Sequence, residues 1–195
     1  MPGRGGTVTE AKPLYARVLG DAWDGLPDEI RDMHTVDGVA VAEGRASVER
    51  GDGLLARLAA AVIGFPAAIE DTPVRVLFEA ANGVETWTRS FGPDTFSSRQ
   101  SAGSGRSAGL VCEHFGPLSF AMALIPEAGR LWLGVRRWTC FGLPLPMALC
   151  PRSTSYEFVE DGRFRFHVEI GHPVTGLIVR YRGWLVPAEG RSPGL

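Results

Sequence analysis

The residues best suited to chemistry lie near the C-terminal end of the chain, in two segments where polar and apolar side chains alternate. A two-residue period places alternate side chains on opposite faces of a strand, so the polar ones share one face. Such a face can be solvated and carry cross-strand arginine–glutamate pairs. It can also face a ligand, because an arginine guanidinium binds a carboxylate through two hydrogen bonds. In this second interpretation His167 and Glu169 are candidate catalytic residues and Arg182 is a candidate ligand-binding residue.

Glu113 is a further candidate catalytic residue. It precedes His114 at the end of an expected strand, where neighbouring side chains point to opposite faces, so only one of the two can face a cavity. A carboxylate inside an apolar cavity can act as a base. His34 and His172 fall in expected connections, where we predict surface or turn positions. Without an HxH or HxxxH spacing or a GxSxG motif, the sequence predicts neither a metal site nor a serine hydrolase.

Aromatic residues indicate another candidate binding surface. Trp132, Arg136 and Trp138 are separated by even numbers of residues within one expected strand, so an unbroken strand would place them on one face. A face that combines a large apolar area with one cation is typical of a ligand cavity. Tyr181, on the last expected strand, is the remaining candidate ligand-binding residue.

These side chains would be positioned mainly by strands. Hairpin signals such as Ala81-Asn82-Gly83 and Glu160-Asp161-Gly162 separate short alternating segments, and strand spacings of roughly 8–12 residues indicate a barrel or a strongly curved sheet. The expected strands cover 39–50, 74–80, 85–91, 96–100, 109–115, 118–125, 131–138, 153–159, 164–170 and 177–185. Gly44, inside the first of them, predicts a bulge or a close backbone approach.

Helices are expected mainly before residue 65. The spacing of apolar residues predicts a helix over 13–23 and a shorter turn over 27–30. A third helix would begin after a capping Asp52, carry Leu54, Leu58 and Val62 on one face, and end at Gly64. The apolar, proline-rich segment from Phe141 to Pro151 cannot be a central strand, and we expect it to pack across a barrel mouth.

The composition, 45% hydrophobic and 22% charged residues, is that of an ordinary soluble protein. A net charge of −2 gives no reason to expect a nucleic-acid partner. The three cysteines form no CxxC pair, which indicates free thiols and a cytoplasmic location, and no apolar run reaches the about 18 residues of a membrane-spanning helix. We predict a single domain over residues 11–189 between disordered tails at 1–10 and 190–195, without a cofactor.

Six phrases spread along the chain resemble, in their order, the family known as domain of unknown function 4166. They are LYARVLGDAWDGLPDEIRDMH (14–34), GRASVERGDGLLARL (44–58), PVRVLFE (73–79), EHFGPLSFAMAL (113–124), GLPLP (142–146) and YRGWLVP (181–187). The resemblance covers Leu14 to Pro187 and brings no catalytic residues with it. Because relatives in this family also occur joined to reductase- or epimerase-like domains, it implies a role in the metabolism of small molecules or lipids, and a reductase or epimerase as a candidate partner.

The expected fold is α+β and mostly β, a curved antiparallel sheet or lipocalin-like barrel of eight to ten strands with two helices near the N-terminus. The expected function is the binding of a hydrophobic or amphipathic small molecule inside that barrel. One alternative is a cofactor-independent cyclase, isomerase or hydratase, in which Glu113, His167 or Glu169 moves protons while Arg136 or Arg182 stabilises negative charge. The other is an accessory partner of an oxidoreductase.

Overall fold

The computed structural model describes residues 12–188, and most of them lie in strands. The predicted tails, 1–10 and 190–195, fall outside the described residues. The helices are α1 (Leu14–Leu19), α2 (Asp28–Met33) and α3 (Leu54–Ile63), with short 3-10 helices η1 (Gly20–Gly25), η2 (Gly105–Ser107) and η3 (Met147–Leu149). The strands are β1 (Val39–Arg50), β2 (Ile69–Ala81), β3 (Val84–Phe91), β4 (Asp94–Ala102), β5 (Val111–Phe115), β6 (Leu118–Glu127), β7 (Arg130–Cys140), β8 (Leu143–Pro144), β9 (Arg152–Glu160), β10 (Arg163–His172) and β11 (Gly176–Pro187).

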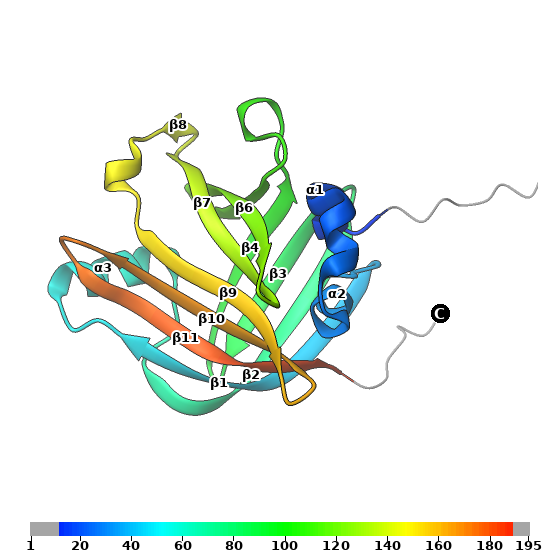
Figure 1. The fold of residues 1–195 in the computed structure, drawn as a ribbon. Coiled ribbons are helices and arrows are strands. Elements are labelled where there is room, and N and C mark those ends of the chain that lie inside the picture. The colour runs from blue at the N-terminus through cyan, green and yellow to red at the C-terminus, as the bar shows by residue number, and fades with distance from the viewer. Residues whose placement is uncertain (1–11, 189–195) are drawn as a thin grey trace, which may run out of the picture.

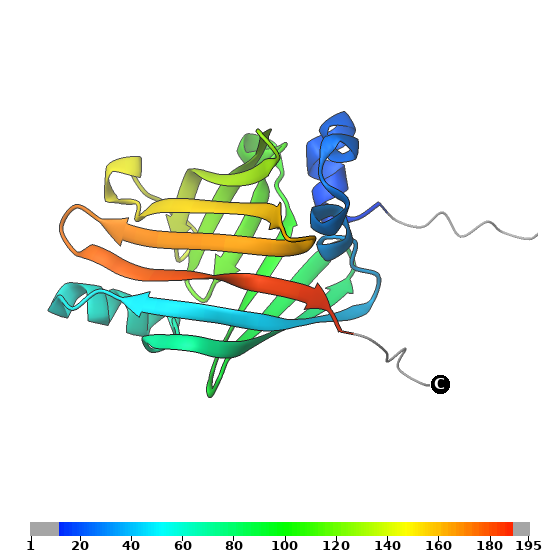
Figure 2. The same cartoon turned by 60° about the horizontal axis from the view of Figure 1, so that its bottom comes forward.

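Ten of these strands form a closed antiparallel barrel (Figures 1 and 2). The order around the ring is β6-β5-β4-β3-β2-β1-β11-β10-β9-β7, and pairing of β6 with β7 closes it. The two-residue strand β8 adds only to the end of β7. The predicted mostly-β fold of eight to ten strands with helices near the N-terminus is therefore confirmed.

The alternation in the sequence sorts the side chains of each strand between the inside and the outside of the barrel. On β10, Phe164 and Phe166 belong to the apolar core, and on β11 Tyr181 and Leu185 do. Full burial of a side chain such as Phe164 contributes roughly 1.5–3 kcal/mol. The apolar side chains whose alternation predicted two half-buried strands are thus the ones that fill the barrel.

Two glycines allow β1 and β11 to approach closely. A Cβ atom added to Gly44 would lie 1.9 Å from the carbonyl oxygen of Trp184, and one added to Gly183 would lie 2.2 Å from that of Arg45. The close approach predicted at Gly44 is confirmed. The irregularity in the pairing of β1 with β2 lies slightly further along, between Ala46 and Val48.

The N-terminal helices and α3 lie at opposite ends of the barrel, as Figure 1 shows. Helix α2 packs against β9 and β10, and α1 lies against β4. Tyr15 of α1 and Ile30 of α2 are completely buried. These two short helices therefore form the floor of the barrel.

Helix α3 presents its larger apolar side chains to solvent. It buries Ala56 and Ala60, whereas Leu54, Leu58 and Val62 are 72%, 56% and 71% exposed. Its N-cap is Gly53 and no side chain bonds to the cap, so the prediction that Asp52 caps the helix is wrong. Gly64 ends it in the left-handed conformation, as predicted.

The 141–151 segment lies at the same end of the barrel as α3. Its side chains are largely exposed, with Phe141 at 81% and Leu143 at 68%. The indole N–H of Trp138 donates to the carbonyl oxygen of Pro146, which ties the segment to β7. The segment therefore stands beside the barrel opening with most of its apolar side chains in solvent, instead of packing them inward as we expected.

The barrel wall has its shortest strand pairing, here called its weak part, between β7 and β9. These strands pair only where Arg130–Trp132 meets Tyr156–Phe158, whereas β6 and β7 pair along ten residue positions. Beyond Trp132 the two strands separate, and the 141–151 segment connects their far ends. Within residues 12–188, no helix combines the length and the apolar character needed to cross a membrane.

Candidate functional site

The barrel encloses an apolar cavity with a volume of about 140 Å³. Aromatic side chains from several strands line it, among them Phe78, Trp87, Phe91 and Phe164. It reaches the weak part of the wall, because Val135 of β7 and Ser153 of β9 are both among its lining residues. A cavity of about 150 Å³ can hold a benzene-sized molecule, so this one suits a compact ring better than a long chain.

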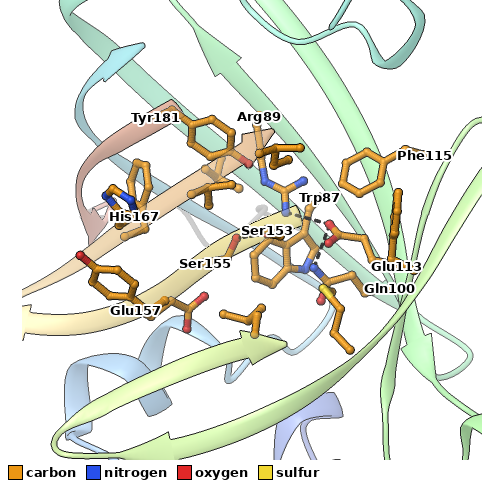
Figure 3. A pocket seen from close by; sticks show the side chains of 18 of the residues that line it. Trp87, Arg89, Gln100, Glu113, Phe115, Ser153, Ser155, Glu157, His167 and Tyr181 are labelled. Carbon is orange, nitrogen blue, oxygen red and sulfur yellow. Dashed lines mark hydrogen bonds and ion pairs between the residues drawn. The ribbon is translucent and has the colours of Figure 1, made fainter. Parts of the chain in front are cut away.

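Three polar residues from β3, β4 and β5, namely Arg89, Gln100 and Glu113, interrupt the apolar wall (Figure 3), and Ser98 of β4 bonds to them. The Oε1 atom of Glu113 accepts hydrogen bonds from the Ser98 hydroxyl at 2.6 Å and the Gln100 amide at 3.1 Å. It also accepts one from the Arg89 guanidinium at 3.2 Å. All three bonds end on Oε1, so the carboxylate is fixed in place through one oxygen.

Arg89 is held by several partners at once. A second guanidinium nitrogen donates to Ser98 at 2.7 Å, and the guanidinium carbon lies 4.9 Å from the ring centre of Trp87. The indole N–H of Trp87 in turn donates to Glu85 at 3.0 Å. Because the side chains of Arg89 and Glu113 are only 13% and 10% exposed, their ion pair lies in a poorly screened environment.

A second buried polar contact, between His34 and Glu157, lies at the floor of the cavity. His34 Nε2 lies 2.7 Å from an oxygen of Glu157, and the ring of Tyr15 stacks on His34 with centroids 3.7 Å apart. His34 lies in the turn that ends α2, as the turn alternative predicted, but it is completely buried and not at the surface. Burial raises the pKa of Tyr15 well above its usual value, and the nearby carboxylates, Glu157 foremost, raise it further.

Three of the predicted site residues lie on the outer face of β10 and β11 or along its edge. Arg182 is 64% exposed and Glu169 bonds Arg180 at 2.7 Å, so the cross-strand pairs of a solvated face are present. The His167 ring stacks on Tyr156, and Figure 3 shows it away from Glu113. Partial burial lowers the pKa of His167, and neighbouring arginines add to this effect while Glu169 opposes it.

An open groove of about 490 Å³ passes over this outer face. Its lining includes His167 and Arg182, together with the exposed ion pair of Arg45 and Asp71. The structure thus brings two of the predicted residues together, but in a solvent-facing groove. We take the enclosed cavity as the candidate site because its polar groups are buried and fixed.

A bulge separates the residues that were expected to share a face of β7. Val135 pairs with Met122 and Arg137 pairs with Ala121, which leaves Arg136 as the extra residue. Trp132 pairs with Ile125 before the bulge, whereas Trp138 stacks on Phe120, a cavity-lining residue, after it. The expected common surface of Trp132, Arg136 and Trp138 is therefore absent.

Glu113, Tyr181 and His167 are the predicted site residues that line the cavity, and His167 also lines the outer groove. Glu113 is 7% exposed while His114 is exposed, as expected for neighbours on a strand. Tyr181 is 8% exposed, and its burial raises its pKa to about 12. Figure 3 shows Tyr181 on the same side of the cavity as Arg89.

The described residues show neither a metal-binding cluster nor a thiol with a lowered pKa. Between residues 12 and 188, no three His, Cys, Asp or Glu side chains come together in a way that could hold a metal ion. The three cysteines are free, and burial raises the pKa of the Cys150 thiol to about 11. Cys150 is therefore a thiol and not a reactive thiolate at neutral pH.

The arrangement of strands and cavity residues can be compared with known families. The family model described as Domain of unknown function (DUF4166) matches residues 26–185. The chain belongs to this family. The matched DUF4166 region contains the polar group around Glu113 as well as His34 and Glu157. Neither the curated proteins nor the solved structures give a match to this chain.

The sequence analysis missed several polar residues in or beside the cavity of this DUF4166 barrel, although the alternation along β3 and β4 indicated that they face inward. Glu85, Trp87 and Arg89 share the parity of the buried Phe91, and Ser98 and Gln100 share that of Phe96. A polar residue on the buried face of a strand requires a buried partner. No pattern in the sequence indicated the contact of His34 with Glu157, because 123 positions separate the two residues.

Proposed function

We propose that the DUF4166 barrel binds a small amphipathic molecule in its cavity. The observation that carries the proposal is a mostly apolar, aromatic-lined cavity whose wall contains a fixed polar cluster: Arg89, Gln100 and Glu113, joined through the neighbouring Ser98. Binding sites for small molecules combine a mostly apolar lining with a few placed polar groups that orient the ligand. The volume of about 140 Å³ supports an apolar part about the size of one ring.

Native mass spectrometry of the freshly purified protein is the first test. A bound molecule that survives purification would appear as an added mass, and solvent extraction would identify it. In parallel, a ring-sized probe such as 3-phenylpropan-1-ol is titrated into the protein by NMR. Binding should shift the indole signal of Trp87, which lies in the cavity wall.

A cavity-filling variant tests where the probe binds. Val135→Phe places a ring in the cavity beside the separation of β7 and β9, and should weaken probe binding at least about tenfold. Val39→Phe is the matched control because Val39 is 54% exposed and is not among the cavity-lining residues. Equal binding by both variants would contradict a site in the cavity.

A proton-transfer enzyme is the second candidate function. It is favoured by the position of Glu113, whose carboxylate lines an apolar cavity and is fixed through one oxygen beside a guanidinium. A ketone such as 4-phenylbutan-2-one in D2O reports such chemistry through exchange of its α-hydrogens. Exchange catalysed by the wild type and abolished in Glu113→Gln would support an isomerase-like role. Co-purification of a reductase- or epimerase-like protein would instead support the accessory role.

A further inference from the structure

The buried charges around the cavity add up to a negative environment. Three buried carboxylates, those of Glu85, Glu113 and Glu157, belong to the inner faces of β3, β5 and β9. They outnumber the two basic groups that oppose them, the guanidinium of Arg89 and the imidazole of His34. The raised pKa of Tyr15 reflects the same environment, because all three carboxylates act on it after the effect of burial.

The cation of the cavity is already engaged. Arg89 is paired with Glu113 and Ser98 and lies over the ring of Trp87. An incoming carboxylate would have to approach within a few ångströms of Glu113 in a poorly screened space, where like charges repel strongly. A fatty-acid-type head group therefore does not match this site.

Among the described residues, Nδ1 of His34 beside the cavity has no hydrogen-bond partner, and neither do two polar atoms of residues that line the cavity. These are Oε1 of Gln100 and the hydroxyl of Tyr15, and both residues are at least 99% buried. An unpaired buried acceptor costs about 1–3 kcal/mol. A ligand that donates hydrogen bonds at this place would remove that cost.

We infer that the cavity selects a ring-sized molecule whose polar head is neutral or cationic and donates hydrogen bonds, and that it rejects the matching carboxylate. The inference rests on the proposed binding function and names the class of ligand. An alcohol and an amine share the required donor. The amine should bind more tightly if the negative charge of the cavity dominates.

The test compares three probes that differ only in their head group: 3-phenylpropan-1-ol, 3-phenylpropan-1-amine and 3-phenylpropanoate. Dissociation constants are measured at neutral pH from the Trp87 indole signal of the wild-type protein. We expect the alcohol or the amine to bind at least about tenfold more tightly than the carboxylate, a difference of about 1.4 kcal/mol. A carboxylate that binds as well as the better of the other two would overturn the inference.

A charge-neutral variant sharpens the test. Glu113→Gln frees the guanidinium of Arg89, which can then receive the carboxylate of the probe, so the preference should shift toward 3-phenylpropanoate by about tenfold or more. Glu169→Gln is the matched control, since Glu169 bonds Arg180 on the outer face of the barrel. The control should keep the wild-type order of the three probes.

The experiments distinguish a wrong head-group selectivity from a wrong binding function. If none of the three probes binds at millimolar concentration and native mass spectrometry shows no added mass, the binding function itself is contradicted. If the carboxylate binds best to the wild type, binding stands and only the head-group selectivity is wrong. The comparison within the wild type also remains decisive if Glu113→Gln does not fold.

Discussion

Arg89 and Glu113 form an ion pair in which each charge depends on the other. Their side chains are 13% and 10% exposed, whereas those of the surface pair Arg75 and Glu43 are 60% and 57% exposed. Solvent screens the surface pair, so such a pair contributes little to stability. The inner pair is different because removing one partner leaves an uncompensated buried charge.

We expect Arg89→Met to lower the free energy of unfolding by about 3 kcal/mol, because Glu113 would remain buried without its cation. Adding Glu113→Gln should recover part of that loss. Urea denaturation at neutral pH measures both variants. The control Arg75→Met should change stability by no more than about 0.5 kcal/mol, and an equal loss in both arginine variants would contradict the inward role of Arg89.

At the level of single residues, the sequence predicted part of the site. Strand parity allowed only one of Glu113 and His114 to face the cavity, and the structure places Glu113 there. Parity could not decide which face of β10 and β11 lies inside, and the outer position of Arg182 depends on how the sheet closes. The packing of α2 against β9 and β10 brings His34 against the cavity-lining residues Glu157 and Tyr15, and no local sequence pattern indicates this contact.

The close approach of β1 and β11 restricts which residue can stand at position 44. The hydrogen-bonded strands β1 and β11 leave no room for a side chain at Gly44, whose added Cβ would lie 1.9 Å from a carbonyl oxygen. The neighbouring atoms belong to backbone, so they cannot move aside without disturbing the pairing. This restriction is local to the two strands and does not involve the cavity.

We expect Gly44→Ala to destabilise the protein by about 2–3 kcal/mol, because the new methyl group forces β1 and β11 apart. Thermal unfolding measures the loss. Gly25→Ala is the matched control, since no atom lies within 4 Å of the added carbon and its φ is not positive. A melting temperature for Gly44→Ala equal to that of the control would show that the strands can separate without cost.

The elements also show why some sequence predictions were wrong. The bulge at Arg136 changes the parity within β7, so even spacing did not place Trp132 and Trp138 together. Helix α3 begins and ends near the predicted positions, and its apolar face of Leu54, Leu58 and Val62 is exposed to solvent. Periodicity locates a helix and cannot say which of its faces meets the barrel.

At the scale of the whole molecule, closure of the barrel buries the hydroxyl groups of Tyr15 and Tyr181 away from water. Burial raises the pKa of Tyr181 to about 12 and that of Tyr15 well above its usual value. A group whose pKa is raised by folding stabilises the fold fully below its unfolded pKa. That contribution is lost as the pH rises from the unfolded value near 10 through the folded value.

We therefore expect stability to fall steeply between about pH 10 and 12, with Tyr181 alone accounting for about 3 kcal/mol. Urea denaturation across this range measures the loss. Tyr181→Phe should remove part of the alkaline decrease, because its ring cannot ionise. Tyr156→Phe deletes a hydroxyl from a half-buried tyrosine, and identical alkaline profiles for the two variants would contradict the expectation.

The ring itself was largely predictable at the scale of the whole chain. Alternation, hairpin turns and regular spacing indicated eight to ten antiparallel strands, and the barrel contains ten. What local patterns could not indicate is the place of closure. The contact of Arg130–Trp132 with Tyr156–Phe158 joins strands that follow different hairpins, and only the accumulated twist and tilt of all strands decides it.

The short contact between β7 and β9 also bears on aggregation. Where the two strands separate, each has a stretch of strand edge with backbone groups that could pair with another chain. Features that discourage such pairing lie beside it: Pro144 and Pro146 have no backbone N–H, and the charged Arg136 and Arg152 occupy the two edges. The part of the wall that the cavity reaches is therefore also the part where the sequence must prevent one barrel from adding its strands to another.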